Sequence, residues 1–382
     1  MPDEKDHSRI PELDGVRGVA VLLVMAFHFL WFPLGFGLWS AQGEGFAGRC
    51  LRLLVLSGWA GVDLFFVLSG FLITGILWDA KDSPTYFRKF YLRRVLRIFP
   101  AYYLVFGLGS WVLPLLAPRM LRGTDPAYPA WLLTYTSNVL LANHGWKSIP
   151  LPFQHFWSLA IEEQFYLLWP FLLSLFSRRQ ALIACVAVLL VCPVLRLMLV
   201  LGGNPLPAYV MTYCRLDSLA AGGLLALLIR GSEGAAVLEW RGFRWVAAAA
   251  GAVLLVLFIV RSGLRLTDPV VATLGFSMLA ALFASVVGAC VSPAHAGFTS
   301  RLFSSAVLRW FGKYSYALYL VHQPVCLFLI TTGVMAVLLQ GPAASSLLML
   351  FGVPLAVSVL LALISWYGCE MWFLRLKTRL AL

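Results

Sequence analysis

Apolar runs of about 20 residues recur along this chain from one end to the other. A helix of that length spans the hydrocarbon core of a bilayer, whereas the strands of a membrane barrel would alternate at period two. The content of 61% hydrophobic and 12% charged residues also lies outside the range of soluble domains. The sequence therefore predicts an all-α, polytopic membrane protein with about ten transmembrane helices around a polar cavity. We place these spans near residues 16–34, 59–79, 100–117, 156–176, 181–201, 208–229, 245–261, 270–291, 314–339 and 346–373.

Basic residues are distributed unevenly between the connecting segments. With the N-terminus in the cytoplasm, most of them fall on the cytoplasmic side, as the positive-inside rule expects, and ten crossings leave both termini there. The net charge of +12 thus reflects topology and does not indicate a nucleic-acid partner. Segment 131–141 is short and polar, so we expect a re-entrant or interfacial piece on the outer side.

The chain shows no linker or change of composition that would mark a second domain. We therefore predict one integral-membrane domain over residues 1–382, without an appended soluble domain. The seven cysteines form no CxxC or Cys/His spacing, so we expect neither a metal site nor a disulfide framework.

The first span, which begins "VRGVAVLLVMAFHFLW", carries an arginine at its start and a histidine near its middle. Arg17 and His28 are eleven residues apart, which places them on one helix face and about 16 Å apart along the axis. A polar stripe from the cytosol to the bilayer centre suits a long, partly anionic molecule. The alternative is that Arg17 extends to the interface while His28 bonds a neighbouring carbonyl.

Other charged residues lie in or beside the spans, where insertion costs are high and function is common. Asp63 falls near the outer end of the second span, and a carboxylate there can pair with an arginine or orient an imidazole. Arg93, Arg94 and Arg97 can cluster on one helix face beside the cytoplasm. Such a cluster fits a phosphate clamp, although attraction to anionic lipid headgroups explains it equally well.

The stretch "HFWSLAIEEQFYLLWP" places two adjacent glutamates in an otherwise aromatic and apolar helix. Ser158, Glu162 and Tyr166 lie on one broad face of it, which favours a functional role for Glu162.

Two further spans carry polar groups. Arg215 and Asp217 are two residues apart on one helix, so each needs a partner elsewhere, such as Glu162 or Asp63. We expect both residues to line the cavity. Tyr319 and His322, in "KYSYALYLVHQP", are further candidates for the lining, although His322 is equally explained as a core residue bonded to a carbonyl.

Six motifs, in this order, resemble the membrane-bound acyltransferase 3 family, which includes O-acetyltransferases of bacterial surface polysaccharides. They are "ELDGVRGVAVLLVMAFHF", "GVDLFFVLSGFLI", "YLRRVLRIFPAYY", "FWSLAIEEQFYLLWP", "CRLDSLAAGG" and "SYALYLVHQP". The arginine followed eleven residues later by histidine is that family's signature, and it falls here on Arg17 and His28.

The resemblance implies a multi-pass protein of the bacterial cytoplasmic (inner) membrane that takes an acyl group, commonly acetyl, from cytosolic acyl-CoA. The group would pass to a hydroxyl at the outer side, and no cofactor would be bound permanently. His28 would be the central catalytic residue, with Glu162 and Asp63 as members of the site, while Arg17, Arg93, Arg94 and Arg97 would bind acyl-CoA. Some relatives carry an SGNH hydrolase-like domain; without one, this chain would acylate its acceptor directly or use a separate extracytoplasmic transferase.

Transfer from a thioester needs a base for the hydroxyl, and an imidazole titrates near neutral pH. We therefore expect His28 to act as general base, with an acyl-histidine relay as the alternative. The acceptor stays open: peptidoglycan, lipopolysaccharide O-antigen, exopolysaccharide, glycolipid or a secreted small molecule would fit. The competing interpretation is a transporter or flippase of a lipid-linked or anionic substrate. A lipid-linked glycosyltransferase and the other membrane-bound O-acyltransferase group are weaker alternatives.

Overall fold

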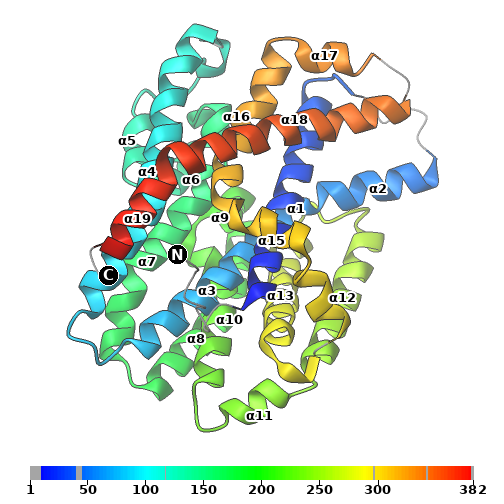
Figure 1. The fold of residues 1–382 in the computed structure, drawn as a ribbon. Coiled ribbons are helices and arrows are strands. Elements are labelled where there is room, and N and C mark those ends of the chain that lie inside the picture. Colours follow the sequence, from blue (N-terminus) through cyan, green and yellow to red (C-terminus); the bar gives the residue numbers. More distant parts are fainter. Residues whose placement is uncertain (1–9, 40–44, 117, 296, 341–342, 380–382) are drawn as a thin grey trace.

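Long helices dominate the computed structural model, which describes residues 10–39, 45–116, 118–295, 297–340 and 343–379. Within these ranges the chain forms helices and turns and no β-strand. Most of the long helices run up and down the molecule (Figure 1). The long helices are α1 (Pro11–Gly35), α3 (Gly61–Asp79), α4 (Tyr86–Leu116), α7 (Phe156–Leu175), α8 (Arg178–Leu201), α10 (Thr212–Ile229), α12 (Phe243–Val260), α13 (Phe276–Val291), α16 (Ser315–Thr331) and α18 (Ala343–Ser365).

Each predicted span falls on one of these helices, which confirms the all-α membrane fold. In the described part of the chain, eight segments are long and apolar enough to cross a bilayer by themselves. The predicted spans at α7 and α16 are not among these eight, because α7 is too polar and α16 is too short. Glu162, Glu163 and Gln164 lower the hydropathy of α7, and α16 has only 17 residues.

Short helices connect the long ones or extend them. They are α2 (Phe46–Leu56), α5 (Tyr128–Leu133), α6 (Ser137–His144), α9 (Pro205–Val210), α11 (Gly234–Glu239), α14 (Phe298–Phe303), α15 (Ala306–Lys313), α17 (Val334–Leu338) and α19 (Met371–Arg379). In Figure 1, α18 and α19 cross the front of the molecule obliquely. The predicted cytoplasmic termini, residues 1–9 and 380–382, lie outside the described residues.

Segment 131–141 forms parts of α5 and α6, and each of these helices is too short to cross a bilayer alone, as predicted. The two helices are separated at Tyr135, whose φ of 53° lies in the left-handed region. Gln164 on α7 donates to the carbonyl of Tyr135 at 2.8 Å and to Oδ1 of Asn138 at 3.0 Å. These bonds satisfy polar groups that a bilayer would leave unpaired, so the segment is held against α7.

Close contact between α3 and α10 depends on two glycines. A Cβ at Gly70 would lie 1.9 Å from the carbonyl oxygen of Leu219, and one at Gly222 would lie 2.0 Å from that of Val67. Small residues allow the backbones of two membrane helices to come into contact. In a bilayer this van der Waals packing stabilises helix association, because the hydrophobic effect does not act between helices that are already in lipid. This contact sets the position of α3, which lines the cavity described next.

Candidate functional site

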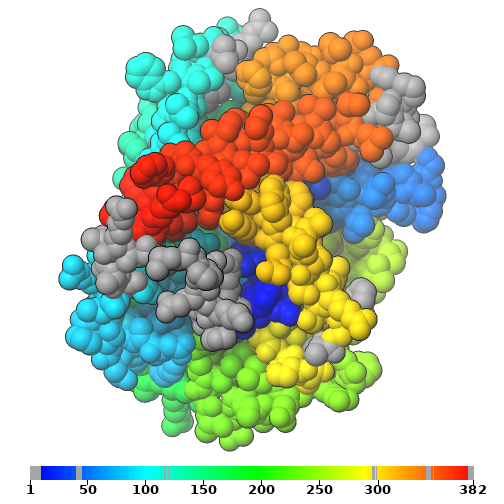
Figure 2. Space-filling view, viewed as in Figure 1, coloured from blue at the N-terminus to red at the C-terminus, as the bar shows by residue number. Residues whose placement is uncertain are grey.

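A cavity of about 170 Å³ lies between α1, α3, α4, α7 and α16. Its polar lining consists of Arg17, Ser69, Arg94, Arg97, Ser158, Glu162, Glu163, Tyr166, Ser315, Tyr316 and Tyr319. In Figure 2 the molecule is hollowed between the red C-terminal helices, the yellow segment around α14 and α15, and the light-blue start of α4. The dark-blue start of α1 lies at the bottom of that hollow.

Three of the four arginines expected to bind acyl-CoA line this cavity. Arg17 forms an ion pair with Asp14 at 2.8 Å, and its side chain is 23% exposed. The guanidinium of Arg94 lies 5.5 Å from the centre of the Tyr166 ring, and Arg97 is exposed at the edge. Arg93 is not part of the lining. The cavity therefore presents three cations that come from two helices.

The carboxylate of Glu162 is held inside the cavity by two hydroxyl groups. Ser69 on α3 donates to its Oε1 at 2.8 Å, and the hydroxyl of Tyr166 lies 3.3 Å from Oε2 and 3.0 Å from Oγ of Ser69. Glu163 also lines the cavity. The predicted face of Ser158, Glu162 and Tyr166 does point into one cavity, and it faces the arginines of α1 and α4.

Three buried or half-buried imidazoles meet beside the cavity. The ring centres of His28 and His322 are 4.9 Å apart, and the ring of His155 lies 5.0 Å from His322 and 6.5 Å from His28. None of the three is part of the cavity lining. Within the described residues, no group of three or more His, Cys, Asp or Glu side chains has the arrangement of a metal site.

The hydrogen bonds of this cluster define the tautomer of His28. Nδ1 of His322 lies 2.7 Å from the carbonyl oxygen of Tyr319, so it carries a proton, and Nε2 of the neutral ring is an acceptor. Nδ1 of His28 lies 3.0 Å from the carbonyl oxygen of Val24 and 3.1 Å from Nε2 of His322. Both neighbours accept, so the proton of His28 is on Nδ1. Its Nε2 therefore keeps a free lone pair, as a general base requires.

Tyr319 connects the cavity to the histidines. Its ring lines the cavity, its hydroxyl lies 2.5 Å from Oγ of Ser158, and its carbonyl accepts from His322. The contact between Ser158 and Tyr319 thus lies between the arginines on one side and the imidazoles on the other.

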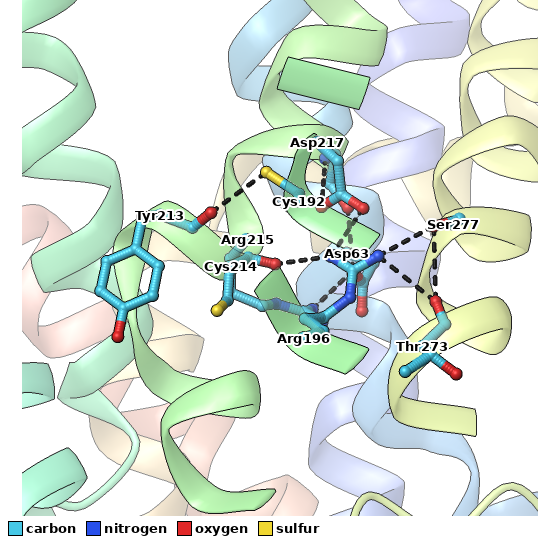
Figure 3. A network of polar contacts seen from close by, with 10 residues as sticks. Asp63, Cys192, Arg196, Tyr213, Cys214, Arg215, Asp217, Thr273 and Ser277 are labelled. Carbon is cyan, nitrogen blue, oxygen red and sulfur yellow. Dashed lines mark hydrogen bonds and ion pairs between the residues drawn. The ribbon is translucent and has the colours of Figure 1, made fainter. Parts of the chain in front are cut away.

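Asp63, Arg215 and Asp217 lie in a separate network, away from the cavity lining (Figure 3). Arg215 donates to Oδ1 of Asp63 at 2.5 Å, and Arg196 forms an ion pair with Asp217 at 2.7 Å. All four side chains are at most 1% exposed. The expected partner of Arg215 is therefore correct, whereas Asp63 lies with Arg215 and Ser218, not with an imidazole. The expected cavity-lining positions of Arg215, Asp217 and His322 do not match the structure.

Sequence reasoning did not single out His155, Ser69 or Arg196 as members of these clusters. His155 precedes the helix that carries Ser158 and Glu162, and its carbonyl accepts from Ser158 at 3.1 Å. His155 could have been identified from the sequence, because its i,i+3 spacing to Ser158 places the two residues near each other on one side of a helix. Ser69 and Arg196 become recognisable only when distant helices are placed together.

A family model described as an acyltransferase domain matches residues 10–366. The chain is 34% identical over 340 residues to "Putative peptidoglycan O-acetyltransferase YrhL" of Bacillus subtilis, which covers 84% of this chain and 49% of that protein. It is 30% identical over 333 residues to the peptidoglycan O-acetyltransferase OatA of Listeria monocytogenes, with 83% of this chain and 49% of that protein covered. The chain spans about half the length of these curated relatives.

No solved structure matches the chain. The family match, however, covers nearly the whole sequence and includes every residue that lines the cavity or forms the histidine cluster. The chain therefore belongs to the acyltransferase 3 family of multi-pass membrane acyltransferases.

Proposed function

We propose that this protein transfers an acetyl group from cytosolic acetyl-CoA to a hydroxyl of peptidoglycan at the bacterial cytoplasmic membrane. Membership of the acyltransferase 3 family supports acyl transfer, and the similarity to YrhL and OatA, which are named as peptidoglycan O-acetyltransferases, favours a peptidoglycan acceptor. The single observation that carries the mechanism is the hydrogen-bond chain from Tyr319 through His322 to His28, which leaves Nε2 of His28 unprotonated.

The arginines of the cavity are suited to the donor. CoA carries phosphate groups, and guanidinium groups bind phosphate oxygens with charge-assisted, often bidentate hydrogen bonds. Arg17, Arg94 and Arg97 supply three such groups at one cavity. The apolar part of the lining then suits the pantetheine arm, which would carry the thioester toward Ser158 and Tyr319.

In the proposed reaction His28 removes the proton of the acceptor hydroxyl through Nε2. The hydroxyl oxygen forms a bond to the carbonyl carbon of the thioester, the C–S bond breaks, and the thiolate of CoA takes the proton from His28. The acceptor ester and free CoA are the products, and the enzyme returns to its starting state. His322 and the carbonyl of Tyr319 keep the proton of His28 on Nδ1 through both steps.

The test uses the purified protein in lipid nanodiscs with labelled acetyl-CoA and a peptidoglycan disaccharide. We expect acetylated disaccharide and stoichiometric CoA, both measured by mass spectrometry. His28→Ala should reduce the rate by at least about 10²-fold. The matched control is His144→Ala, because His144 is exposed on α6 and lies outside the cluster.

Three results would overturn the proposal or its mechanism. Absence of CoA release by the wild-type protein would favour the transporter interpretation. Full activity of a folded His28→Ala protein would remove the proposed base. Acetyl covalently attached to His28 in an acceptor-free incubation would replace direct transfer with an acyl-histidine relay.

A further inference from the structure

His155 is the one imidazole of the histidine cluster whose ring nitrogens have no hydrogen-bond partner in the described structure. The residue is only 3% exposed. Burial of a polar group without a partner costs free energy, and in native proteins such groups commonly mark a bound water, an ion or a functional role. His155 therefore needs an explanation that packing does not provide.

The backbone of His155 is fixed on both sides, and this sets the place of its ring. Its N–H donates to Oε1 of Gln323 at 3.2 Å, while its carbonyl accepts from Oγ of Ser158 and from the hydroxyl of Tyr319, both at 3.1 Å. The ring packs edge-on against Phe156, with centres 4.7 Å apart, and against His322. Two helices, α7 and α16, thus hold the imidazole in place. The backbone of Tyr319 and the side chain of Gln323 lie near the ring, but neither ring nitrogen makes a hydrogen bond.

The place of this ring relative to the cavity suits the acceptor and not the donor. Glu162 lies seven residues further along α7, about 10 Å along the axis, and it lines the arginine-rich cavity. His155 lies at the other end, where α7 begins and where the segment with α5 and α6 joins it. That end faces the outer side in the predicted topology, from which a peptidoglycan hydroxyl would arrive.

We propose that His155 binds the hydroxyl of the acceptor and orients it toward Nε2 of His28. A hydroxyl offers one donor and two lone pairs, so it can donate to one neutral imidazole and accept from another. The ring centres of His28 and His155 are 6.5 Å apart, which accommodates one oxygen atom hydrogen-bonded to a nitrogen of each ring at about 2.8 Å. His155 keeps its proton throughout, and the proton of the hydroxyl goes to His28 as in the reaction above. This inference rests on the proposed function.

The experiment compares His155→Phe and His155→Asn with wild type in the nanodisc assay, with the peptidoglycan disaccharide as acceptor. His155→Phe keeps the volume of the ring and removes both nitrogens. We expect kcat/KM for the disaccharide to fall at least about tenfold, while the Kd of acetyl-CoA stays within about twofold. His155→Asn keeps a short polar group, and we expect a loss of the same kind. His144→Phe, at an exposed position near the end of α6, is the matched control and should leave both constants unchanged.

The separate readouts make the outcomes decisive. The thermal midpoint shows which variants fold, and a result from either folded variant decides the test. An unchanged kcat/KM for the disaccharide in a folded variant would overturn the role of His155 and leave the proposed function intact. A parallel loss of acetyl-CoA affinity would also overturn it, because the residue would then act on the donor or on packing. Absence of transfer by wild type would instead reject the proposed function.

Discussion

His28 and Arg17 show how much of the site could be predicted at the scale of single residues. Their shared helix face was predicted from spacing alone, and Arg17 does line a polar cavity. His28 was expected at the same cavity, but it is not part of the lining; the lining residue Tyr319 connects the cavity to His322, the neighbour of His28. The partners of His28 could not be predicted, because His322 is 294 residues away and meets it only when α1 packs against α16.

The tautomer of His28 leads to a prediction for His322. Replacement by Phe removes one of the two acceptors for the Nδ1 proton of His28 and leaves only the carbonyl of Val24, so the preference for the tautomer with a free Nε2 weakens. We expect kcat to fall about tenfold for His322→Phe. His322→Gln keeps an oxygen that can accept from Nδ1, and it should recover part of that loss. The measurement is kcat with saturating acetyl-CoA, whose Kd should not change; equal kcat values for the two variants would contradict the assignment.

The arginines of α4 allow a phosphate clamp to be distinguished from a headgroup-binding surface. Arg94 lines the cavity, whereas Arg88 is exposed in the same basic segment. We expect Arg94→Gln to raise the Kd of acetyl-CoA about tenfold, equivalent to about 1.4 kcal/mol, because one charge-assisted contact is lost. Arg88→Gln is the control. For acetyl-pantetheine, which has no phosphates, both variants should bind like wild type; an equal loss for both substrates would argue against a phosphate contact.

At the scale of elements, α3 and α10 are joined by backbone contact at Gly70 and Gly222. We expect Gly70→Ala to destabilise the protein by about 1–3 kcal/mol, because the new methyl group would overlap the carbonyl of Leu219. Gly251→Ala on α12 is the matched control, since a Cβ there meets nothing within 4 Å. The measurement is the thermal midpoint in detergent. A midpoint for Gly70→Ala at or above that of the control would show that the helices can separate without cost.

The connection between α12 and α13 gives a prediction with a defined pH dependence. Burial alone would raise the pKa of Asp268, but hydrogen bonds from Arg261 and from the N–H groups of Val270 and Val271 outweigh it and bring the pKa below its ordinary 3.8. A lowered carboxyl pKa stabilises the folded state above the unfolded pKa, and this contribution is lost as the pH falls through the folded pKa. The thermal midpoint of Asp268→Asn should therefore lie below that of wild type at pH 7. The difference should narrow below about pH 4; a constant difference down to pH 3 would contradict the ion pair.

The sequence patterns predicted the elements but not the ion pairs between them. Apolar length predicted the spans, and the polar content of 131–141 predicted a segment that does not cross. Spacing also showed that Arg215 and Asp217 cannot pair with each other. It could not identify their partners, because Asp63 lies 152 residues from Arg215 and on another helix. The sequence left either an arginine or an imidazole as the partner of Asp63, and the packing of α3 on α10 brings it to the guanidinium of Arg215.

At the scale of the whole molecule, the cavity and the histidine cluster lie on opposite sides of the contact between Ser158 and Tyr319. The two substrates should therefore be required on opposite faces of the membrane. In sealed vesicles of one orientation, we expect acetyl-CoA to support transfer only from the face at which α1 and α4 begin, and the disaccharide to react only from the other face.

Orientation in those vesicles can be read from two single-cysteine positions. Arg88 and Lys147 are both exposed, and the charge distribution places them on opposite sides. A membrane-impermeant maleimide should label Arg88→Cys from the face that accepts acetyl-CoA and Lys147→Cys from the face that accepts the disaccharide, above the background of the native cysteines. Labelling of both positions from one face would contradict the single crossing, by α4, that is predicted between them. Donor and acceptor acting from the same face would contradict the entry of the two substrates from opposite sides of the contact between Tyr319 and Ser158.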